Sequence, residues 1–243
     1  MTVRHEVRLL GREPCGADIL TLRLSRPEGY EFKAGQWFTL SIDTADGGET
    51  KTFSHCSGPS DDYLEMTTRL SSSSFKKALA TMAPGARAHV AGPGGRLALA
   101  PDTDRVCFLV GGTGITPVRS ILRDAMHNDR VFADALLLFG NRDDSCVPFA
   151  EEFEQMSSHG VRLELCFENP PAGWGGESGF ITADIVRRHL DDVQTTPFFV
   201  AGPPLMVSSV ERVLDDLRVP EPLRHIERFG PPVSTLLRRA EST

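Results

Sequence analysis

A glycine-rich segment at residues 111–117 has the composition of a loop that binds nucleotide phosphates. It reads Gly-Gly-Thr-Gly-Ile-Thr-Pro and directly follows an apolar run at residues 106–110. Glycines let a backbone approach a pyrophosphate, and the N–H groups that open the next helix favour an anion. Pro117 suits a first helical turn, where its missing N–H is not needed. The alternative is a tight strand-to-helix turn whose glycines serve only steric needs.

The chain around this loop has the pattern of a parallel sheet covered by helices. Near-continuous apolar runs alternate with amphipathic stretches, which is typical of strands buried on both faces. The expected strands are residues 106–110, 135–139, 161–167 and 198–201. The loop therefore lies at the carboxyl end of the opening strand, where open parallel sheets bind ligands. This position favours the nucleotide over the steric alternative.

The first hundred residues have a different pattern. Short segments alternate apolar and polar residues between turn signals, as in an antiparallel barrel or sandwich. Examples are residues 19–24, 37–42 and 63–68, and one helix is expected at residues 75–82, after a run of serines. We therefore predict a β plus α/β protein with two domains, residues 1–100 and 101–243.

Composition excludes several function classes. The net charge of -7 argues against a general affinity for nucleic acid or anionic membranes, since both attract basic surfaces. No apolar run approaches the ~18 residues that span a bilayer, and the first residues lack the apolar core of a signal peptide. We expect a cytoplasmic protein. The cysteines at positions 15, 56, 107, 146 and 166 are too widely spaced for a metal knuckle, so no metal site is predicted.

Four motifs of the second half, in order and spacing, resemble those of the ferredoxin-NADP reductase family. Residues 111–117 match its nicotinamide-nucleotide loop, and residues 138–142 with 149–153 are similar to the segment that holds the adenosine half. Residues 201–206 resemble its C-G-P-x-x-M element, and residues 227–229 its terminal E-x-F. The resemblance implies nucleotide-binding residues Gly111, Gly112, Thr113, Gly114, Pro117, Asn141, Arg142, Gly202, Pro203 and Met206, and a catalytic role for Glu227.

The first half resembles the family's Greek-key flavin barrel. Residues 35–38 are similar to its G-Q-(F/Y) strand entry, and residues 51–54 stand in the place of its R-x-Y-S flavin motif. The strand at residues 67–69 and the serine loop match segments that touch the flavin. The resemblance implies flavin-binding residues Lys51, Thr52, Phe53, Ser54, Thr67, Arg69, Ser73 and Ser74, with Ser54 also catalytic.

The residue types at positions 51–54 suit a flavin nucleotide. Such a cofactor carries phosphate charge, a flat ring and an N5 atom that accepts hydride. Lys51 would supply the cation, Phe53 the apolar contact and Ser54 a hydroxyl near N5. Taken without the resemblance, the same residues fit a plain barrel strand.

Three positions depart from the family's pattern. Lys51 replaces arginine and so loses the bidentate fork that grips phosphate. Phe53 replaces tyrosine, and Ala201 stands where many members carry a cysteine beside the nicotinamide. Arg142 could meet the 2′-phosphate of NADPH. It is equally consistent with a solvated loop residue, which leaves NADPH and NADH both open.

The resemblance implies an enzyme that transfers hydride from NADPH or NADH to bound FAD, with FMN as the alternative flavin. Electrons would then pass to a separate ferredoxin, flavodoxin or oxygenase component, because the sequence stops soon after Gly230-Pro231-Pro232 without clustered cysteines. Two alternatives remain at this point. One is direct reduction of a small molecule or free flavin, and the other is a non-catalytic electron-transfer subunit of a larger complex.

Overall fold

The computed structural model describes residues 3–230 of the chain. Two sheets form, and grouping of residues by their contacts gives two compact units. The first unit holds the residues up to 100 together with residues 116–130, and the second holds residues 101–115 and those from 131 onward. Pro231, Pro232 and the following residues, on which the expectation of a separate acceptor rests, lie outside the described part.

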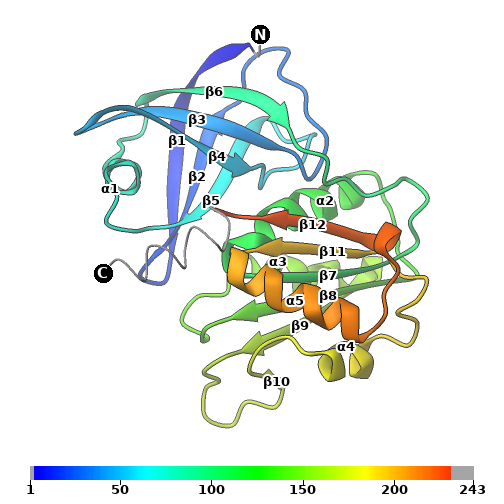
Figure 1. The fold of residues 1–243 in the computed structure, drawn as a ribbon. Coiled ribbons are helices and arrows are strands. Elements are labelled where there is room, and N and C mark those ends of the chain that lie inside the picture. Colours follow the sequence, from blue (N-terminus) through cyan, green and yellow to red (C-terminus); the bar gives the residue numbers. More distant parts are fainter. Residues whose placement is uncertain (1–2, 231–243) are drawn as a thin grey trace. The chain divides into compact units, whose positions relative to one another are not determined.

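The first sheet is antiparallel and curled (Figure 1). Its strands are β1 (Arg4–Cys15), β2 (Ile19–Ser25), β3 (Trp37–Thr44), β4 (Gly47–Ser54), β5 (Tyr63–Arg69) and β6 (Arg87–Gly94), in the order β4-β3-β6-β1-β2-β5. The alternating residues place one face of each strand in a shared apolar core that includes Leu22, Phe38 and Val90. The predicted antiparallel barrel architecture is therefore confirmed.

One α-helix of this unit lies between β5 and β6, as the sequence predicts. The helix α1 (Ser74–Thr81) begins after Ser73, whose hydroxyl oxygen accepts a hydrogen bond from the backbone N–H of Lys76 at 3.4 Å. This is the usual way in which a serine satisfies an otherwise unpaired N–H at a helix start. Phe75 and Leu79 face the barrel core and fix the orientation of the helix.

The second sheet is parallel, as predicted. Its strands are β7 (Arg105–Gly111), β8 (Asp134–Asn141), β9 (Val161–Phe167), β10 (Glu177–Ser178), β11 (Phe198–Gly202) and β12 (Arg224–Arg228), in the order β10-β9-β8-β7-β11-β12. Residues 106–110 of β7 are completely buried, which explains their continuous apolar run.

The remaining helices connect these strands. They are α2 (Ile115–His127), α3 (Ala150–Gln155), α4 (Ala183–His189) and α5 (Pro204–Asp216). Apolar residues of α4 and α5, such as Val186 and Val210, share one core with Leu109 of β7 and Leu138 of β8. Within the described residues, no helix is both long and apolar enough to cross a bilayer.

Candidate functional site

The glycine loop closes the carboxyl end of β7. Residues 112–114 form a short 3-10 turn, and α2 begins at Ile115. Gly112 has a φ of 51°, which glycine adopts without strain. A Cβ atom on Gly114 would lie 2.1 Å from the carbonyl oxygen of Ala201. The loop therefore packs directly on the end of β11, at a distance that only glycine permits.

The segment after β11 completes the same edge of the sheet. Gly202 has a φ of 155°, and Pro203 precedes the first residue of α5. The Met206 sulfur lies 3.1 Å from the position of a Cβ atom on Gly202, and the Met206 Cγ lies 3.2 Å from that of a Cβ atom on Gly111. Met206 thus covers both glycines, so any side chain added at either position would displace it.

These two segments flank the point in the sheet where the order of strand addition reverses. From β7 the chain first adds β8 and β9 on one side, and it later adds β11 and β12 on the other. Such a switch point leaves a crevice at the carboxyl ends of the two central strands, which is where open α/β sheets bind ligands. The absence of side chains at Gly112 and Gly114 lets a phosphate approach the backbone there. The donor set of this edge fits a nucleotide.

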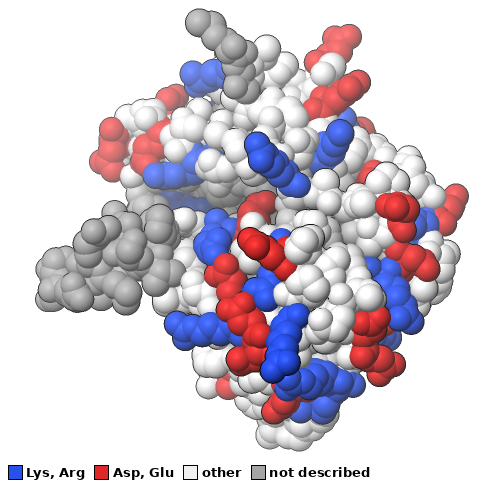
Figure 2. All heavy atoms as spheres, turned by 45° about the vertical axis from the view of Figure 1, so that its right-hand side comes forward, with Lys and Arg blue, Asp and Glu red and all other residues white. Residues whose placement is uncertain are grey.

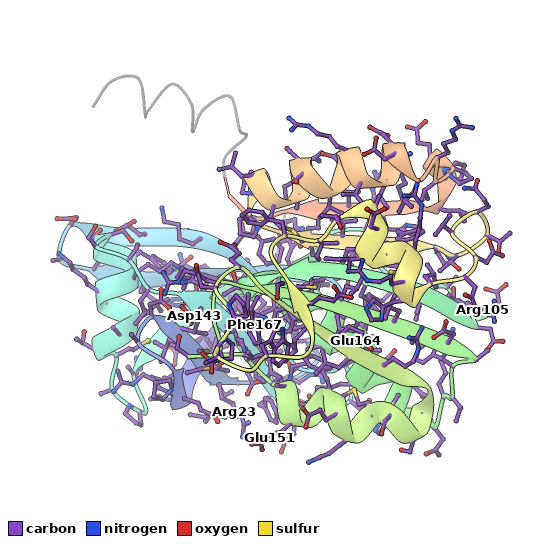
Figure 3. All side chains as sticks on the ribbon, turned by 90° about the horizontal axis from the view of Figure 1, so that it is seen from below. Arg23, Arg105, Asp143, Glu151, Glu164 and Phe167 are labelled. Carbon is purple, nitrogen blue, oxygen red and sulfur yellow. The ribbon has the colours of Figure 1, made fainter. Side chains whose placement is uncertain are left out.

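The predicted adenosine-side residues follow β8 at the same edge. Figure 3 shows Asp143 and Phe167 at this end of the sheet and Arg105 at the opposite end. The Asn141 side chain is buried and donates to the Phe139 carbonyl at 3.4 Å. Arg142 is exposed, and its Nε lies 3.2 Å from a carboxylate oxygen of Asp143. A hydroxyl hydrogen bond from Ser145, followed by its backbone N–H and Arg142, lowers the pKa of Asp143.

The ladder between β11 and β12 brings Glu227 to this region. Glu227 pairs with Ala201 in the parallel register, next to the position where Gly114 meets the Ala201 carbonyl. The backbone N–H of Phe229 donates to the Gly202 carbonyl at 2.9 Å, which ties the E-x-F segment to the Gly-Pro turn. The structure thus gathers the predicted nucleotide residues at one sheet edge. Pro117 is the exception, since its contacts group it with the barrel unit.

In the barrel unit, the predicted flavin residues lie along the seam between β4 and β5. These strands are the two ends of the sheet order, and they come close to each other although no ladder joins them within residues 3–230. Lys51 and Phe53 lie on one face of β4, because side chains alternate along a strand, and Thr52 lies on the other. The Phe53 ring stacks on that of Phe75 in α1, with the ring centres 5.9 Å apart.

Ser54 ends β4 and begins a segment that bridges the seam. The backbone N–H of His55 donates to the Gln36 carbonyl at 2.9 Å, and that of Cys56 donates to the Glu65 carbonyl at 2.8 Å. The backbone N–H of Glu65 in turn donates to the Ser57 hydroxyl at 3.1 Å. These bonds hold the buried Ser54 in a fixed place at the end of the seam.

The other predicted flavin residues lie on β5 and at the start of α1. Thr67 is buried, and its hydroxyl lies 2.8 Å from that of Thr21. Arg69 forms an ion pair with Asp18. Ser73 caps α1, whereas the Ser74 hydroxyl donates to the carboxylate of Glu49 on β4. Hydroxyls, an aromatic ring and cations therefore gather at this seam. This donor set fits the phosphates and the flat ring of a flavin nucleotide.

Sequence reasoning missed a buried charged network in the same unit. Arg119 of α2 donates to the carboxylate of Glu65 and, at 3.0 Å, to the Cys56 carbonyl. The other carboxylate oxygen of Glu65 accepts from Arg23 at 3.1 Å. The Arg23 guanidinium lies 4.1 Å from the centre of the Tyr63 ring. The only available signal was a charged residue within the apolar pattern of β5.

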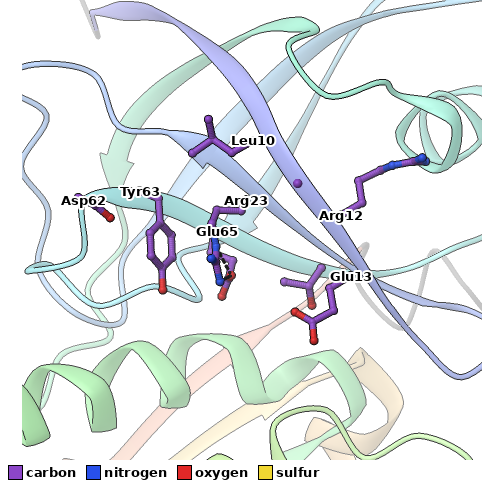
Figure 4. A pocket seen from close by; sticks show the side chains of 9 residues that line it. Leu10, Arg12, Glu13, Arg23, Asp62, Tyr63 and Glu65 are labelled. Atoms are coloured by element: carbon purple, nitrogen blue, oxygen red, sulfur yellow. Dashed lines mark hydrogen bonds and ion pairs between the residues drawn. The ribbon is translucent and has the colours of Figure 1, made fainter.

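The face of β1, β2 and β5 beside this network carries a hollow of about 510 Å³. Figure 4 shows Tyr63, Arg23 and Glu65 side by side in its lining. Within this lining, Arg23 and Glu65 form an ion pair at 3.1 Å. Within the described residues, no group of three His, Cys, Asp or Glu side chains is arranged to hold a metal ion.

Comparisons with known proteins agree with this geometry. The family model described as the oxidoreductase NAD-binding domain matches residues 108–212. Over 237 residues the chain is 29% identical to ferredoxin--NADP reductase B of Sorangium cellulosum, covering 92% of this chain and 97% of that protein. The chain is thus similar to ferredoxin-NADP reductases over almost its whole length. The NAD-binding match identifies the chain as an oxidoreductase, and its relatives are named as NADP- or NADH-dependent reductases.

Other relatives are named for a different electron acceptor. The reductase is 30% identical to NADH-cytochrome b5 reductase 1 of Aspergillus terreus over 154 residues, which is 59% of this chain and 51% of that protein. The crystal structure of a ferredoxin NADP+ reductase from Neisseria gonorrhoeae, with bound FAD and NADP, has the same fold. Its TM-score is 0.79 at 22% identity, covering 93% of this chain and 98% of that one.

Charge does not single out a docking site for an electron carrier on the face of the reductase in Figure 2. Cationic and anionic side chains are interspersed there. Many exposed charges of the parallel-sheet unit pair with each other, as Arg162 does with Asp134 at 3.0 Å and Arg187 with Asp184 at 3.1 Å. The electron acceptor must therefore be identified by experiment.

Proposed function

We propose that this reductase takes hydride from NADPH or NADH and delivers the electrons to a separate protein carrier, such as a ferredoxin, a flavodoxin or an oxygenase component. When bound, the flavin supplies the hydride acceptor, and the nicotinamide nucleotide supplies the hydride. The single observation that carries this proposal is the glycine-lined edge at the switch point of a sheet that follows a curled barrel with an open seam. The glycine-lined edge suits a dinucleotide, and the open seam of the barrel suits a flavin.

In this proposal, the barrel unit holds the flavin. Phe53 packs against the ring, while Ser54, fixed by the bridging segment, presents a hydroxyl to the reacting edge. Thr67 and Arg69 contact the flavin from β5, and Lys51, Ser73 and Ser74 supply donors for its phosphates. Thr52 supports the strand from the opposite face. This assignment is supported by the gathering of donors along the seam, which is the only place in the described barrel where the ladder is open.

The parallel-sheet unit holds NAD(P)H in this proposal. The backbone of residues 111–114 receives the pyrophosphate, and Asn141 and Arg142 face the adenosine half. Gly202, Pro203 and Met206 shape the nicotinamide side, while the Glu227 carboxylate holds a proton or a hydrogen bond near the transferred hydride. Pro117 fixes the start of α2. The ladder that pairs Glu227 with Ala201 supports placing the carboxylate beside the nicotinamide.

The visible spectrum tests the proposal directly. Purified protein should show flavin absorption bands, and these should bleach when NADPH or NADH is added without oxygen. Reoxidation of the reduced protein by a panel of acceptors then identifies the partner. The panel consists of a ferredoxin, a flavodoxin, cytochrome b5 and free FMN. Fast reoxidation by a protein carrier supports the proposal. If free FMN is the better acceptor, the chain is a direct reductase. If bound flavin does not bleach, the chain is not a reductase of this type.

A further inference from the structure

Lys76 occupies an unusual position for a lysine. It lies in the first turn of α1, and its ammonium donates to the Thr68 hydroxyl on β5. The same ammonium lies 4.6 Å from the centre of the Phe53 ring on β4. It therefore sits where the two edges of the seam meet α1. Within the described residues, no carboxylate pairs with it.

The hydration that a half-buried ammonium loses in such a place is only partly compensated by its neighbours. A hydroxyl and an aromatic face offset less of the lost hydration than a carboxylate would. Burial, with a smaller effect from the charge of Lys51, lowers the pKa of Lys76 to about 8. Two cationic side chains therefore act on the same small region.

Lys51 differs from Lys76 because its charge already has a partner. Its ammonium lies 3.6 Å from a carboxylate oxygen of Glu49, and about half of its side chain is exposed to solvent. The other oxygen of the same carboxylate accepts from the Ser74 hydroxyl. An anion that approached Lys51 and Ser74 would therefore meet the negative charge of Glu49. An anion that approached Lys76 would meet an unpaired cation.

We propose that Lys76 is the principal cation for the phosphate of the bound flavin nucleotide, and that Lys51 is secondary because Glu49 neutralises it. This inference rests on the proposed flavin function and assigns its phosphate to a residue outside the motif at positions 51–54. The ammonium would exchange the Thr68 hydroxyl for a phosphate oxygen, or bind both, since it has three donors. Phe53 would then contact both the cation and the flavin ring.

The proposal carries a pH dependence. The groups that face Lys76 are Lys51 and Phe53 from β4 and Thr68 from β5, and the charge of Lys51 adds to the effect of burial. A phosphate favours the charged ammonium, so flavin binds best when Lys76 is protonated. With a pKa of about 8, Lys76 loses its charge as the pH rises from 7 to 9. The affinity for FAD should fall over the same range.

Binding of three flavins by the full chain, after its own flavin has been removed, tests the inference. FAD and FMN carry phosphate, whereas riboflavin has the same ring without phosphate. Lys76→Met should weaken FAD and FMN by about 10- to 100-fold and leave riboflavin unchanged, because a charged hydrogen bond contributes roughly that factor. The Lys76→Arg variant should bind FAD almost as tightly as the parent does. Its affinity for FAD should not decline between pH 7 and 9.

Two matched variants complete the test. Lys77→Met changes an exposed lysine on the same helix and should behave like the parent. Lys51→Met should weaken FAD less than Lys76→Met does. The inference is overturned if Lys76→Met binds FAD like the parent, if it weakens riboflavin as much as FAD, or if Lys51→Met has the larger effect. Should the parent bind no flavin at all, the proposed function itself fails, which is a separate result.

Discussion

Arg119 and Glu65 form an ion pair in which both side chains are almost completely buried, at 6% and 3% exposure. The pair joins α2, the helix that follows the glycine loop, to β5 at the seam of the barrel. Arg119 also donates to the Cys56 carbonyl, two residues after Ser54. Through this pair, the helix supports the segment that holds Ser54.

We expect Glu65→Met to be the costlier single change, since it leaves the buried Arg119 without its carboxylate, and it should lower the free energy of unfolding by about 3 kcal/mol. Arg119→Met should cost less, because Glu65 keeps its ion pair with the half-exposed Arg23. The double variant should be destabilised by much less than the sum, because no buried charge remains. Urea unfolding of the parent, both single variants and the double variant measures this coupling. Additive effects would show that the pair contributes nothing as a pair.

The buried His55 predicts how stability depends on pH. Burial, with a smaller effect from Arg26, lowers the pKa of His55 to about 3, and its Nδ1 has no hydrogen-bond partner. In the unfolded chain the pKa is near 6.5, so the folded form excludes a proton that the unfolded form takes up. His55 therefore contributes no penalty above about pH 6.5, and stability falls as the pH drops from there towards 3.

Comparison of two histidine variants isolates this effect. His55→Phe keeps the stacking on Phe32, whose ring centre lies 3.7 Å away, and removes the titration. The loss of stability between pH 7 and 5 should then be smaller than in the parent by about 1.4 kcal/mol per pH unit below 6.5. His127→Gln, at an exposed position, should follow the parent. If all three proteins lose stability equally, His55 does not set the acid response.

Much of the fold follows from local patterns in the sequence. The alternation in residues 19–24 predicts β2, and the continuous apolar run in residues 106–110 predicts β7. A strand buried on one face alternates apolar and polar residues, whereas a strand buried on both faces is apolar throughout. The contacts of α2 could not be predicted in this way. An apolar stripe shows that a helix face is buried, but it does not name the partner. In the structure, Arg119, Ser120 and Arg123 tie the helix to residues 56–63.

The glycine-lined edge of the parallel sheet was easier to predict than the seam of the barrel. Residues 111–117 are contiguous, so their chemistry is visible in one stretch of sequence. The cluster around Lys76 joins residues from β4, β5 and α1, which are distant in sequence. In the sequence, Lys76 is simply one of two adjacent lysines that follow the serine run. Its contacts with Thr68 and Phe53, and the packing of Phe53 on Phe75, show that the three elements meet.

Ser54→Ala tests the proposed hydroxyl at the flavin. The change should leave flavin content intact and slow the reduction of flavin by NAD(P)H by roughly tenfold or more, which corresponds to ~1.4 kcal/mol for one hydrogen bond made in the transition state. Stopped-flow absorbance measures the rate. Ser60→Ala, at an exposed turn position of the same unit, is the matched control and should be neutral. An unchanged rate in Ser54→Ala would remove Ser54 from the mechanism.

Arg142→Ala and Asp143→Asn test coenzyme choice together. A guanidinium that meets a 2′-phosphate matters only for NADPH, so Arg142→Ala should raise KM for NADPH and leave NADH almost unchanged. Asp143 neutralises Arg142 in the structure, so Asp143→Asn should lower KM for NADPH. Steady-state kinetics with both coenzymes measures the difference, and Arg187→Ala is the control at an exposed position. If both coenzymes weaken equally in Arg142→Ala, the residue is structural.

Gly114→Ala tests the nucleotide edge without touching the flavin seam. The new Cβ atom would lie 2.1 Å from the Ala201 carbonyl oxygen, and neither backbone can yield without moving the loop away from β11. We expect a loss of stability of about 1 to 3 kcal/mol and a much weaker affinity for NADP+. Flavin content should be unchanged, because the flavin residues belong to the other unit. Gly175→Ala is the matched control, since a Cβ there meets nothing within 4 Å. A titration of each protein with NADP+ measures the affinity. If Gly114→Ala binds NADP+ as the parent does, the phosphates do not bind at residues 111–114, and the glycines serve only the turn.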